Sequence, residues 1–455
     1  TREPHDIFFP LPPEGDMMSG RKLRILHCAD LHLDSPFYGI SDISPSLGSF
    51  LRKASFRAFE NAVSHAIASK TDFFLVSGDI YDGEDRSVRA QVFFLEQLKR
   101  LSGAGIPSFI AAGNHDSLSG WEADRDFPPL AVRFGPDVES FPLVTAGGER
   151  IGTIHGYSFP VRNVEENIAL RFAQRRGEGV NIAMLHCNTG GRKGHENFAP
   201  CSLDDLKSAG MDYWALGHVH TAEILCRTPL IAYPGIIQGR HARESGEKGV
   251  YEVVLTMSSG SLPASAAAEF VPCDAVRWMS EHLSITGMDR DEDFFQALAG
   301  LKEEARNGAG GRPVILRVAL SGRGRVHEML RRPGFLRGSG GLMDTLNAQE
   351  AERPDFVHTV GISDTTAPAL DLEFLSAGEH FVGDFLKEVR SFTKRGDLRE
   401  GMMDILRERG LLDKIRQSGD VLERIESLSE NEVGELLDRS VFSTLSGLLE
   451  GEPGL

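Results

Sequence analysis

The sequence predicts an α/β protein, because two local patterns alternate along most of its length. Short apolar runs bounded by turn residues are typical of buried strands. Longer runs with apolar positions at three- and four-residue steps lie between them and are typical of helices. This alternation is characteristic of an α/β domain, and a chain of 455 residues with 41% hydrophobic content suits two or three domains.

Five apolar runs between residues 21 and 258 share one plan, in which the apolar stretch leads through a small residue to Asp, His or Asn. In chain order they are LRILHCADLH (23–32), DFFLVSGDIYD (72–82), IPSFIAAGNHD (106–116), VNIAMLHCN (180–188) and DYWALGHVH (212–220). Helical patterns intervene at 55–70 and 87–105. Because α/β domains place their sites at the carboxyl ends of strands, these polar clusters mark a candidate site.

The remaining segments divide the chain into regions. Residues 258–268, SSGSLPASAAA, are expected to be a hairpin tip or a linker. Amphipathic patterns in the last 93 residues (363–455) predict helices that pack within their own domain or dock a partner's helix. We therefore expect a flexible N-terminal extension (1–20), a first α/β domain (21–268), a small α/β domain (269–362) and a C-terminal helical region (363–455).

Composition argues against several classes of protein. A net charge of -17 disfavours binding of nucleic acid through a broad basic surface, although bound metal ions could still make one site positive. The five cysteines include no CxxC pair, which argues against a disulfide framework and a thiolate zinc site. No stretch reaches the roughly 18 consecutive apolar residues of a membrane helix, and residues 1–22 lack the charged-then-apolar order of a secretion signal. We expect a cytoplasmic protein without a membrane anchor.

The polar residues after the apolar runs are oxygen and nitrogen donors. They are Asp30, His32, Asp79, Asp82, Asn114, His115, Asp116, His186, His218 and His220. Such donors suit manganese, iron, zinc or magnesium. On a strand, residues two apart project to the same side, so the pairs Asp30/His32 and His218/His220 can each present two donors. One such residue alone is more often a capping group, but five segments together favour a metal site, because unpaired buried carboxylates and imidazoles are costly.

The motifs D-x-H, G-D-x-x-D, G-N-H-D, H-x-N and G-H-x-H follow in this order over residues 30–220 and resemble the calcineurin-like metallophosphoesterase superfamily. The segments ADLHLDSPF, APCSLDDL, DYWALGHVH and YPGIIQGRH are similar to the bacterial YhaO/SbcD-type branch of DNA double-strand-break repair nucleases, most of all to YhaO-type members. The resemblance implies a core of two mixed β-sheets packed as a sandwich flanked by helices (αββα). A small α/β cap domain and a C-terminal helical region would follow this core.

The resemblance also implies two divalent metal ions that share one aspartate. One ion would be held by Asp30, His32, Asp79 and His220, and the other by Asp79, Asn114, His186 and His218. Mn²⁺ is the expected metal, with Fe²⁺, Mg²⁺ and Zn²⁺ as alternatives. The activity implied is the hydrolysis of phosphodiester bonds by a metal-activated hydroxide.

Further roles are carried over from the same resemblance. His115 would protonate the leaving oxygen, and Asp82 would orient His115. Archaeal and eukaryotic repair nucleases that resemble the chain have a histidine at the place of Asp82, so the contacts of that histidine do not transfer. Arg240 and His241 are candidates for binding the substrate phosphate, and a plain surface loop is the alternative for both. Asp116 is expected to have a structural role in the turn that contains it.

Three functions compete on this basis. The first is a metal-dependent DNA exonuclease that acts in DNA repair with an SbcC-like ATPase subunit of the SMC type, with a homodimer as a further implication of the family. The second is a small-molecule phosphoesterase that acts on nucleotides or lipid-linked phosphates, because one metal centre can serve many substrates. The third is a mainly scaffolding subunit of an ATPase complex.

Overall fold

The computed structural model describes residues 22–450, apart from 36, 38–44, 83–86, 121–125, 146–147, 174, 193–195, 258–262, 351, 370–371, 379–380, 395–396, 409–424 and 426. The extension predicted for residues 1–20 therefore lies outside the described residues. The chain forms two compact units. The first consists of Thr1–Ser280, Lys302–Arg317 and Leu346–Gly361, and the second consists of Glu281–Leu301, Val318–Thr345 and Ile362–Leu455.

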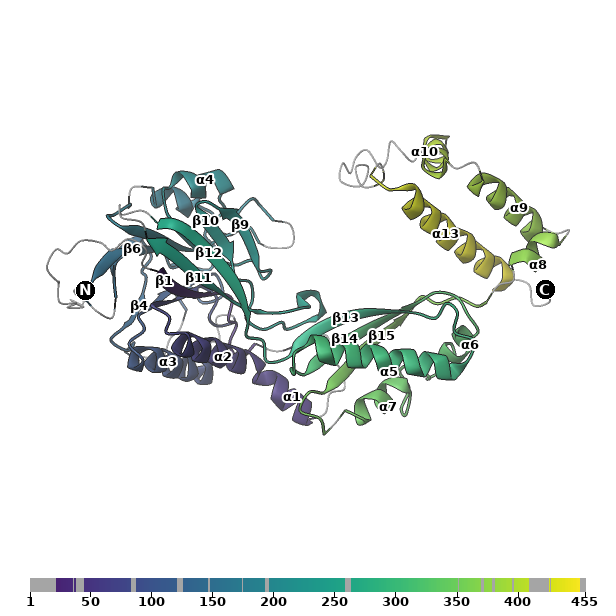
Figure 1. Ribbon diagram of the computed structural model, residues 1–455, viewed down its shortest axis with the longest axis horizontal. Helices are drawn as coiled ribbons and strands as arrows, with labels where there is room; N and C mark the ends of the chain where they lie inside the picture. Colours follow the sequence, from purple (N-terminus) through teal and green to yellow (C-terminus); the bar gives the residue numbers. More distant parts are fainter. Residues whose placement is uncertain are drawn as a thin grey trace. The chain divides into compact units, whose positions relative to one another are not determined.

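Two six-stranded mixed sheets form the first unit (Figure 1). The first sheet has the order β12 (Pro263–Pro272), β11 (Gly249–Met257), β1 (Lys22–Cys28), β2 (Phe73–Ser77), β3 (Ser108–Ala111) and β4 (Ala131–Arg133). The second has the order β5 (Glu139–Val144), β6 (Arg150–Gly156), β7 (Val180–His186), β8 (Tyr213–Gly217), β10 (Leu230–Tyr233) and β9 (Glu223–Arg227). Strands β1 to β4 run parallel, as do β6, β7, β8 and β10.

Apolar side chains between and outside the sheets define four layers. One buried cluster joins the facing sides of the sheets and includes Ile25, Leu75 and Ile182. Helices α2 (Ala54–Ala68) and α3 (Val88–Gly103) pack on the outer side of the first sheet through Phe59 and Phe94. The short α4 (Leu203–Ser208) and the 3₁₀ turn η1 (Ile168–Arg171) cover the outer side of the second. The predicted αββα sandwich is confirmed.

The segment 258–268 is only partly the predicted hairpin tip or linker. Residues 258–262 lie outside the described residues, but Pro263 already begins β12, which pairs antiparallel with β11, for instance Ala268 with Val253. The sequence pattern missed the first part of this strand because Ala and Ser have little preference for strands. At the edge of the sheet, backbone hydrogen bonds to β11 hold the strand whatever its side chains are.

A third sheet of three strands follows, with the order β13 (Arg277–Ser284), β14 (Val314–Ser321) and β15 (Val357–Asp364). The helices of this region are α5 (Asp291–Gly308), α6 (Val326–Leu330) and α7 (Leu342–Ala348). Near the N-terminus, α1 (Pro45–Arg52) precedes α2. Helix α5 connects β13 to β14 along the chain.

The C-terminal region is helical, as predicted. Its described helices are α8 (Leu372–Ala377), α9 (Phe381–Thr393), α10 (Leu398–Glu408) and α13 (Glu430–Glu450). Val382 and Leu386 of α9 pack against Val441 and Leu445 of α13, so these two amphipathic stripes bury each other. Among the described residues, no helix combines the length and the apolar character needed to cross a membrane.

The two sheets of the first unit approach closely at the end of β8. A Cβ atom added to Gly217 would lie 1.9 Å from the carbonyl oxygen of Ser77 at the end of β2, and 2.8 Å from Nδ1 of His186 at the end of β7. Only glycine fits such an approach. The ends of β2, β7 and β8 therefore meet at one place, and the polar residues that follow them are brought together.

We expect Gly217→Ala to destabilise the protein by about 1 to 3 kcal/mol, because the added methyl group must push apart two backbones. Denaturant unfolding of the full chain would measure the loss. Gly103→Ala is the matched control, since a Cβ there would meet no atom within 4 Å. Its unfolding free energy should change by less than about 1 kcal/mol. Equal stabilities of the two variants would contradict the close approach.

Candidate metal centre

The polar residues of the site lie just beyond the strands, where the backbone turns sharply. Asp30, His32, Asp79 and His218 have φ angles of 50°, 41°, 52° and 100°. Left-handed backbone at residues other than glycine costs of order 1 to 3 kcal/mol each and persists only where its surroundings fix it. Here the fixing contacts include the backbone N–H of Asp30, which donates to the Gly78 carbonyl at 3.0 Å.

This geometry corrects the argument that strand alternation pairs the donors. His218 and His220 follow β8, which ends at Gly217, and β1 ends at Cys28 before Asp30. The alternation rule does not apply to residues outside a strand. The donors converge instead because each loop turns toward the place where the strand ends meet.

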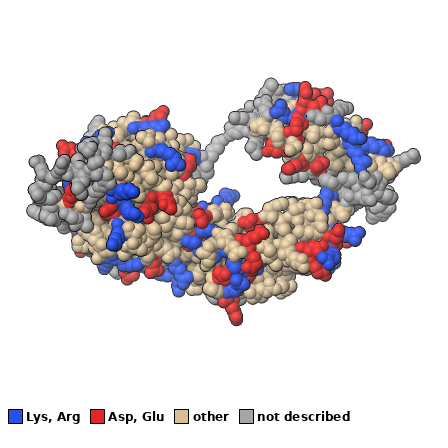
Figure 2. Space-filling view, viewed as in Figure 1, with Lys and Arg blue, Asp and Glu red and all other residues tan. Residues whose placement is uncertain are grey.

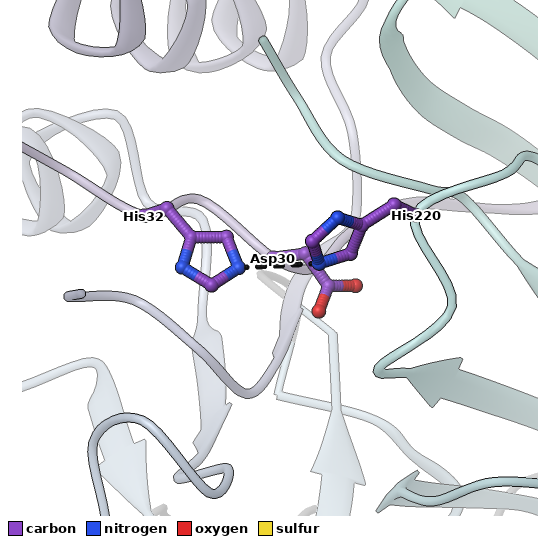
Figure 3. Close-up of side chains that lie close together, drawn as sticks. All are labelled: Asp30, His32 and His220. Atoms are coloured by element: carbon purple, nitrogen blue, oxygen red, sulfur yellow. Dashed lines mark hydrogen bonds between the residues drawn. The ribbon is translucent and has the colours of Figure 1, made fainter. Parts of the chain in front are cut away.

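One group of donors consists of Asp30, His32 and His220 (Figure 3). Their ligand atoms all lie within 4.8 Å of one another. The Nε2 atoms of His32 and His220 are 3.3 Å apart, and Asp30 is fully buried beside them. Both carboxylate oxygens of Asp30 accept the backbone N–H of His218 at 3.1 Å. Burial raises the pKa of the Asp30 carboxyl and lowers the pKa of His32 to about 3.

A second group consists of Asp30, Asp79 and His186. The Nδ1–H of His186 donates to the Ser77 carbonyl at 2.9 Å, which leaves Nε2 directed into the site. That Nε2 lies 3.0 Å from Oδ1 of Asn114. Burial opposes the charged form of His186, but the negative charge of Asp79 outweighs it and raises the pKa of the imidazole to about 9.

Asp79, a member of the second group, also faces His32 of the first. Its Oδ2 is 3.4 Å from Nε2 of His186 and 3.9 Å from Nε2 of His32. Its Oδ1 accepts the backbone N–H of His115 at 2.9 Å. Burial alone would raise its pKa, but His186 and His32 hold the pKa of Asp79 well below its usual range. A single buried carboxylate thus faces the imidazoles on both sides.

His218 and His220 diverge from the same loop. The His220 imidazole faces His32, whereas the ring centre of His218 lies 5.2 Å from that of His186. Nε2–H of His218 donates to the Glu196 carbonyl at 2.8 Å, so in the neutral imidazole Nδ1 holds the lone pair. The two histidines therefore serve opposite sides of Asp79.

His115 and Asp82 form a pair at the more open edge of the site. Nδ1 of His115 lies 3.2 Å from Oδ1 of Asp82, and the His115 side chain is 30% exposed. The hydrogen bond to Asp82 raises the pKa of the His115 imidazole. Oδ2 of Asp82 accepts the Ser35 hydroxyl and Nη1–H of Arg240, the latter at 3.3 Å. Burial alone would raise its pKa, but the bond to His115 and the nearby His32 imidazole hold the pKa of Asp82 well below its usual range.

Arg240 is a buried cation, so the surface-loop alternative is wrong for it. Only 8% of the residue is exposed. The side chains of Gln238 and Trp278 hold its loop, with Gln238 donating to the Val276 carbonyl at 2.7 Å and Trp278 to the Gly239 carbonyl at 3.1 Å. His241 differs, because its side chain is 35% exposed and its Nδ1 accepts the backbone N–H of Arg243.

Two residues around the site were not predicted as site residues from the sequence. Oε1 of Glu244 lies 2.7 Å from Nδ1 of His220, and the Ser35 hydroxyl donates to Asp82. Ser35 lies within the segment ADLHLDSPF but was given no role there, and Glu244 lies outside the motifs, 24 residues from His220. Asp116, in contrast, holds the turn as expected, since its carboxylate accepts the backbone N–H groups of Gly113, Asp79 and Ile80.

The donors fit a pair of divalent cations. Two buried carboxylates face imidazole nitrogens, which is the ligand chemistry of manganese, iron and zinc. Nδ1 of His32 is buried and makes no hydrogen bond among the described residues, but it lies 3.5 Å from Oδ1 of Asp82. Asp82 can therefore support Nδ1–H when Nε2 of His32 serves as a ligand. A third group, His32, Asp82 and His115, is less suited to a cation because Asp82 already pairs with Arg240.

Comparison with known proteins places this site in a family. A model of the calcineurin-like phosphoesterases matches residues 23–222. A protein of Bacillus subtilis named "Uncharacterized metallophosphoesterase YhaO" is 32% identical over 81% of this chain and 87% of its own length. The chain belongs to the calcineurin-like metallophosphoesterase family. A second model, the middle domain of metallophosphoesterase YhaO, matches residues 278–364.

More distant similarity reaches proteins named "DNA double-strand break repair protein Mre11". The protein from Aeropyrum pernix is 28% identical over 50% of this chain and 56% of its own length. The protein from Sulfurisphaera tokodaii is 28% identical over 45% of this chain and 50% of its own. As a metallophosphoesterase, the chain carries a candidate two-metal site in the expected part of its fold, and the resemblance stated from the motifs is confirmed.

We expect the metal-free protein to bind two Mn²⁺ ions per chain and Asp79→Asn to bind neither, because the substitution removes the charge that faces both sides. At Mn²⁺ concentrations 100 times the Kd, each bound ion should stabilise the wild type by about 2.7 kcal/mol, and the stability of the variant should be unchanged. Metal analysis and thermal melting would measure both effects.

Asp72→Asn is the control, since the Asp72 carboxylate accepts a backbone N–H of Arg24 away from the site. It should retain both ions. If Asp79→Asn still took up two ions per chain, Asp79 would not be a shared ligand.

Proposed function

We propose that the chain is a metal-dependent DNA phosphodiesterase that degrades DNA from its ends, with two Mn²⁺ ions as its cofactor. The observation that carries the proposal is the position of Asp79 Oδ2, within 4 Å of imidazole nitrogens on two sides. Membership of the metallophosphoesterase family supports the reaction type. The archaeal relatives named for DNA double-strand break repair support DNA as the substrate.

We assign the proposed ligands to two sets, one on each side of Asp79. Asp30, His32, Asp79 and His220 would hold one ion, and Asp79, Asn114, His186 and His218 would hold the other. Two bound divalent ions would act as Lewis acids on the phosphodiester and make a water molecule a nucleophile at neutral pH. The protein supplies the fixed positions of these side chains.

His115 is placed to give a proton to the leaving oxygen. Its Nδ1 is engaged by Asp82, so Nε2 is the atom that carries the proton outward. Its side chain is 30% exposed, whereas the side chains of His32 and Asp79 are at most 2% exposed. A partly exposed imidazole beside buried donors suits contact with a substrate.

Arg240 adds a positive charge next to His115. Its guanidinium shares Asp82 with that imidazole, and its Nε makes no hydrogen bond among the described residues. We propose that Arg240 helps to hold the substrate phosphate. His241, on the more exposed side of the same turn, is the weaker candidate for this contact.

Charge supports recognition of DNA at the site instead of along a broad basic surface. The chain has a net charge of -17, and on the face shown in Figure 2 the Lys and Arg side chains are interspersed with Asp and Glu. Two divalent ions would add four positive charges beside Asp30 and Asp79. An anionic backbone can therefore be attracted to the metal centre of an acidic protein.

The C-terminal helices are proposed to hold a partner, an SMC-type ATPase subunit. Phe381 of α9 is 70% exposed and Ile405 of α10 is 50% exposed, although neighbouring residues of α9 are buried against α13. Exposed apolar side chains on amphipathic helices are suited to a protein surface. The partner, a homodimer, a cytoplasmic location and the domain limits given above stay predictions.

We expect Mn²⁺-loaded wild-type protein to degrade linear DNA from its ends, and His115→Ala to slow this by about 100-fold or more while it retains two ions. Gel analysis of end-labelled DNA, with metal analysis of the same samples, would measure both quantities. His65→Ala is the control, because His65 lies on α2 and bonds to Glu252. It should degrade DNA at the wild-type rate.

The same assay separates DNA from small substrates. If the loaded protein cleaved a small aryl phosphodiester but degraded no DNA, and DNA did not compete with that substrate, the small-molecule function would replace the present proposal. Loss of both ions in His115→Ala would make His115 a structural residue instead of a proton donor.

A further inference from the structure

We propose that Glu244 is a positioning residue of the metal centre, which fixes the tautomer of His220 and anchors Arg240 with its two carboxylate oxygens. This inference rests on the proposed function, since it concerns the same metal ions and the same phosphate-binding arginine. Glu244 belongs to no motif of the sequence. It ends the 3₁₀ turn η2 (Ala242–Glu244), between β10 and β11.

The first oxygen of Glu244 acts on His220. Oε1 lies 2.7 Å from Nδ1 of His220, and the Glu244 side chain is 6% exposed. An ionised carboxylate can only accept hydrogen bonds, so Nδ1 of His220 must carry the proton of this bond. In the neutral imidazole, Nε2 then keeps its lone pair. That Nε2 faces His32 at 3.3 Å, in the donor group that also contains Asp30.

The second oxygen of Glu244 acts on the loop of Arg240. Oε2 accepts the backbone N–H of Arg240 at 2.8 Å. Oε1 also lies 3.8 Å from Nη2 of Arg240 and 3.5 Å from Nε2 of His241. One buried side chain therefore connects a proposed ligand of one metal ion to the proposed phosphate contact. Glu244 therefore contacts the His220 side of the centre, and it makes no described contact with His186 on the other side.

The arrangement is asymmetric, and this makes the inference testable. On the His186 side, the backbone carbonyl of Ser77 holds the imidazole Nδ1–H. Side-chain substitution cannot remove that carbonyl. On the His220 side, the Glu244 carboxylate accepts the corresponding Nδ1–H, and a substitution can remove this acceptor. Loss of such an outer partner of a ligand histidine costs about 10- to 100-fold in metal affinity.

Glu244→Gln is a sharp probe because it keeps the shape of the side chain. An amide has one oxygen and one NH₂ group, whereas the site presents two donors, Nδ1–H of His220 and N–H of Arg240. In either orientation of the amide, NH₂ faces one of these donors. If NH₂ faces His220, the imidazole must shift its proton to Nε2, which blocks the ligand lone pair. If NH₂ faces Arg240, the turn loses its anchor.

The matched control is Glu252→Gln. Glu252 also bonds to an imidazole, with Oε2 2.8 Å from Nε2 of His65, but that pair joins α2 to β11 outside the site. The substitution therefore removes the same kind of carboxylate–histidine bond without touching a proposed ligand. Glu244→Asp is the conservative variant, because it retains two accepting oxygens on a shorter side chain.

The experiment measures Mn²⁺ binding to the metal-free full chain by calorimetry and by the electron paramagnetic resonance signal of free Mn²⁺. We expect wild type and Glu252→Gln to bind two ions alike. Glu244→Gln should keep one ion at the wild-type affinity and bind the other 10- to 100-fold more weakly. Glu244→Asp should recover part of that loss. The melting temperature of each metal-free variant checks the fold independently.

Two results would overturn the inference. One is wild-type affinity for both ions in Glu244→Gln. The other is an equal loss of both ions with a lowered melting temperature of the metal-free protein, in Glu244→Asp as well as in Glu244→Gln, which would make Glu244 a structural residue. Failure of the wild type to bind a pair of ions is a different outcome, because it would overturn the proposed function itself.

Discussion

The burial of the Asp79 carboxylate is the constraint on which the rest of the site depends. An ionised carboxylate in a dry interior costs several kcal/mol unless opposite charge and hydrogen bonds surround it. Asp79 is 1% exposed, and the groups that meet this cost are the imidazoles of His32 and His186 and the backbone N–H of His115. Those three groups lie at the ends of β1, β7 and β3, and Asp79 itself follows β2, so the two sheets must meet where they do. The approach at Gly217 and the strained backbone of Asp79 follow from the same requirement.

The sequence predicted the identity of the donors because they follow apolar runs, and strand ends of parallel sheets share an edge. It predicted the sandwich through its resemblance to a family, and the long helices through their periodicity. It could not predict how the donors converge. That depends on left-handed backbone at Asp30 and His32, which alternation along a strand does not describe. The first part of β12 was missed for a related reason, since pairing with β11 holds it and its own small side chains do not.

Individual side-chain contacts between distant segments could not be predicted from the sequence. The sequence assigned no role to Glu244 or Ser35, because each acts through a partner far along the chain, His220 for Glu244 and Asp82 for Ser35. Arg240 was left between a phosphate contact and a surface loop, because turn residues around it are common to both. Its burial is decided by Gln238 and Trp278, which tie its loop to the start of the third sheet.

Asp82 explains why a buried arginine can stand beside this metal centre. Its carboxylate accepts from Ser35 and Arg240 and also pairs with His115, so one anion serves a guanidinium and an imidazole. A histidine in the place of Asp82 would supply no negative charge there. An imidazole could not balance a guanidinium that is only 8% exposed, and a buried cation without a counterion is costly. Glu244, at 3.8 Å from the guanidinium, gives a second but weaker counterion. Arg240 and Asp82 therefore belong together, and a change of Asp82 to histidine would require a change at Arg240 as well.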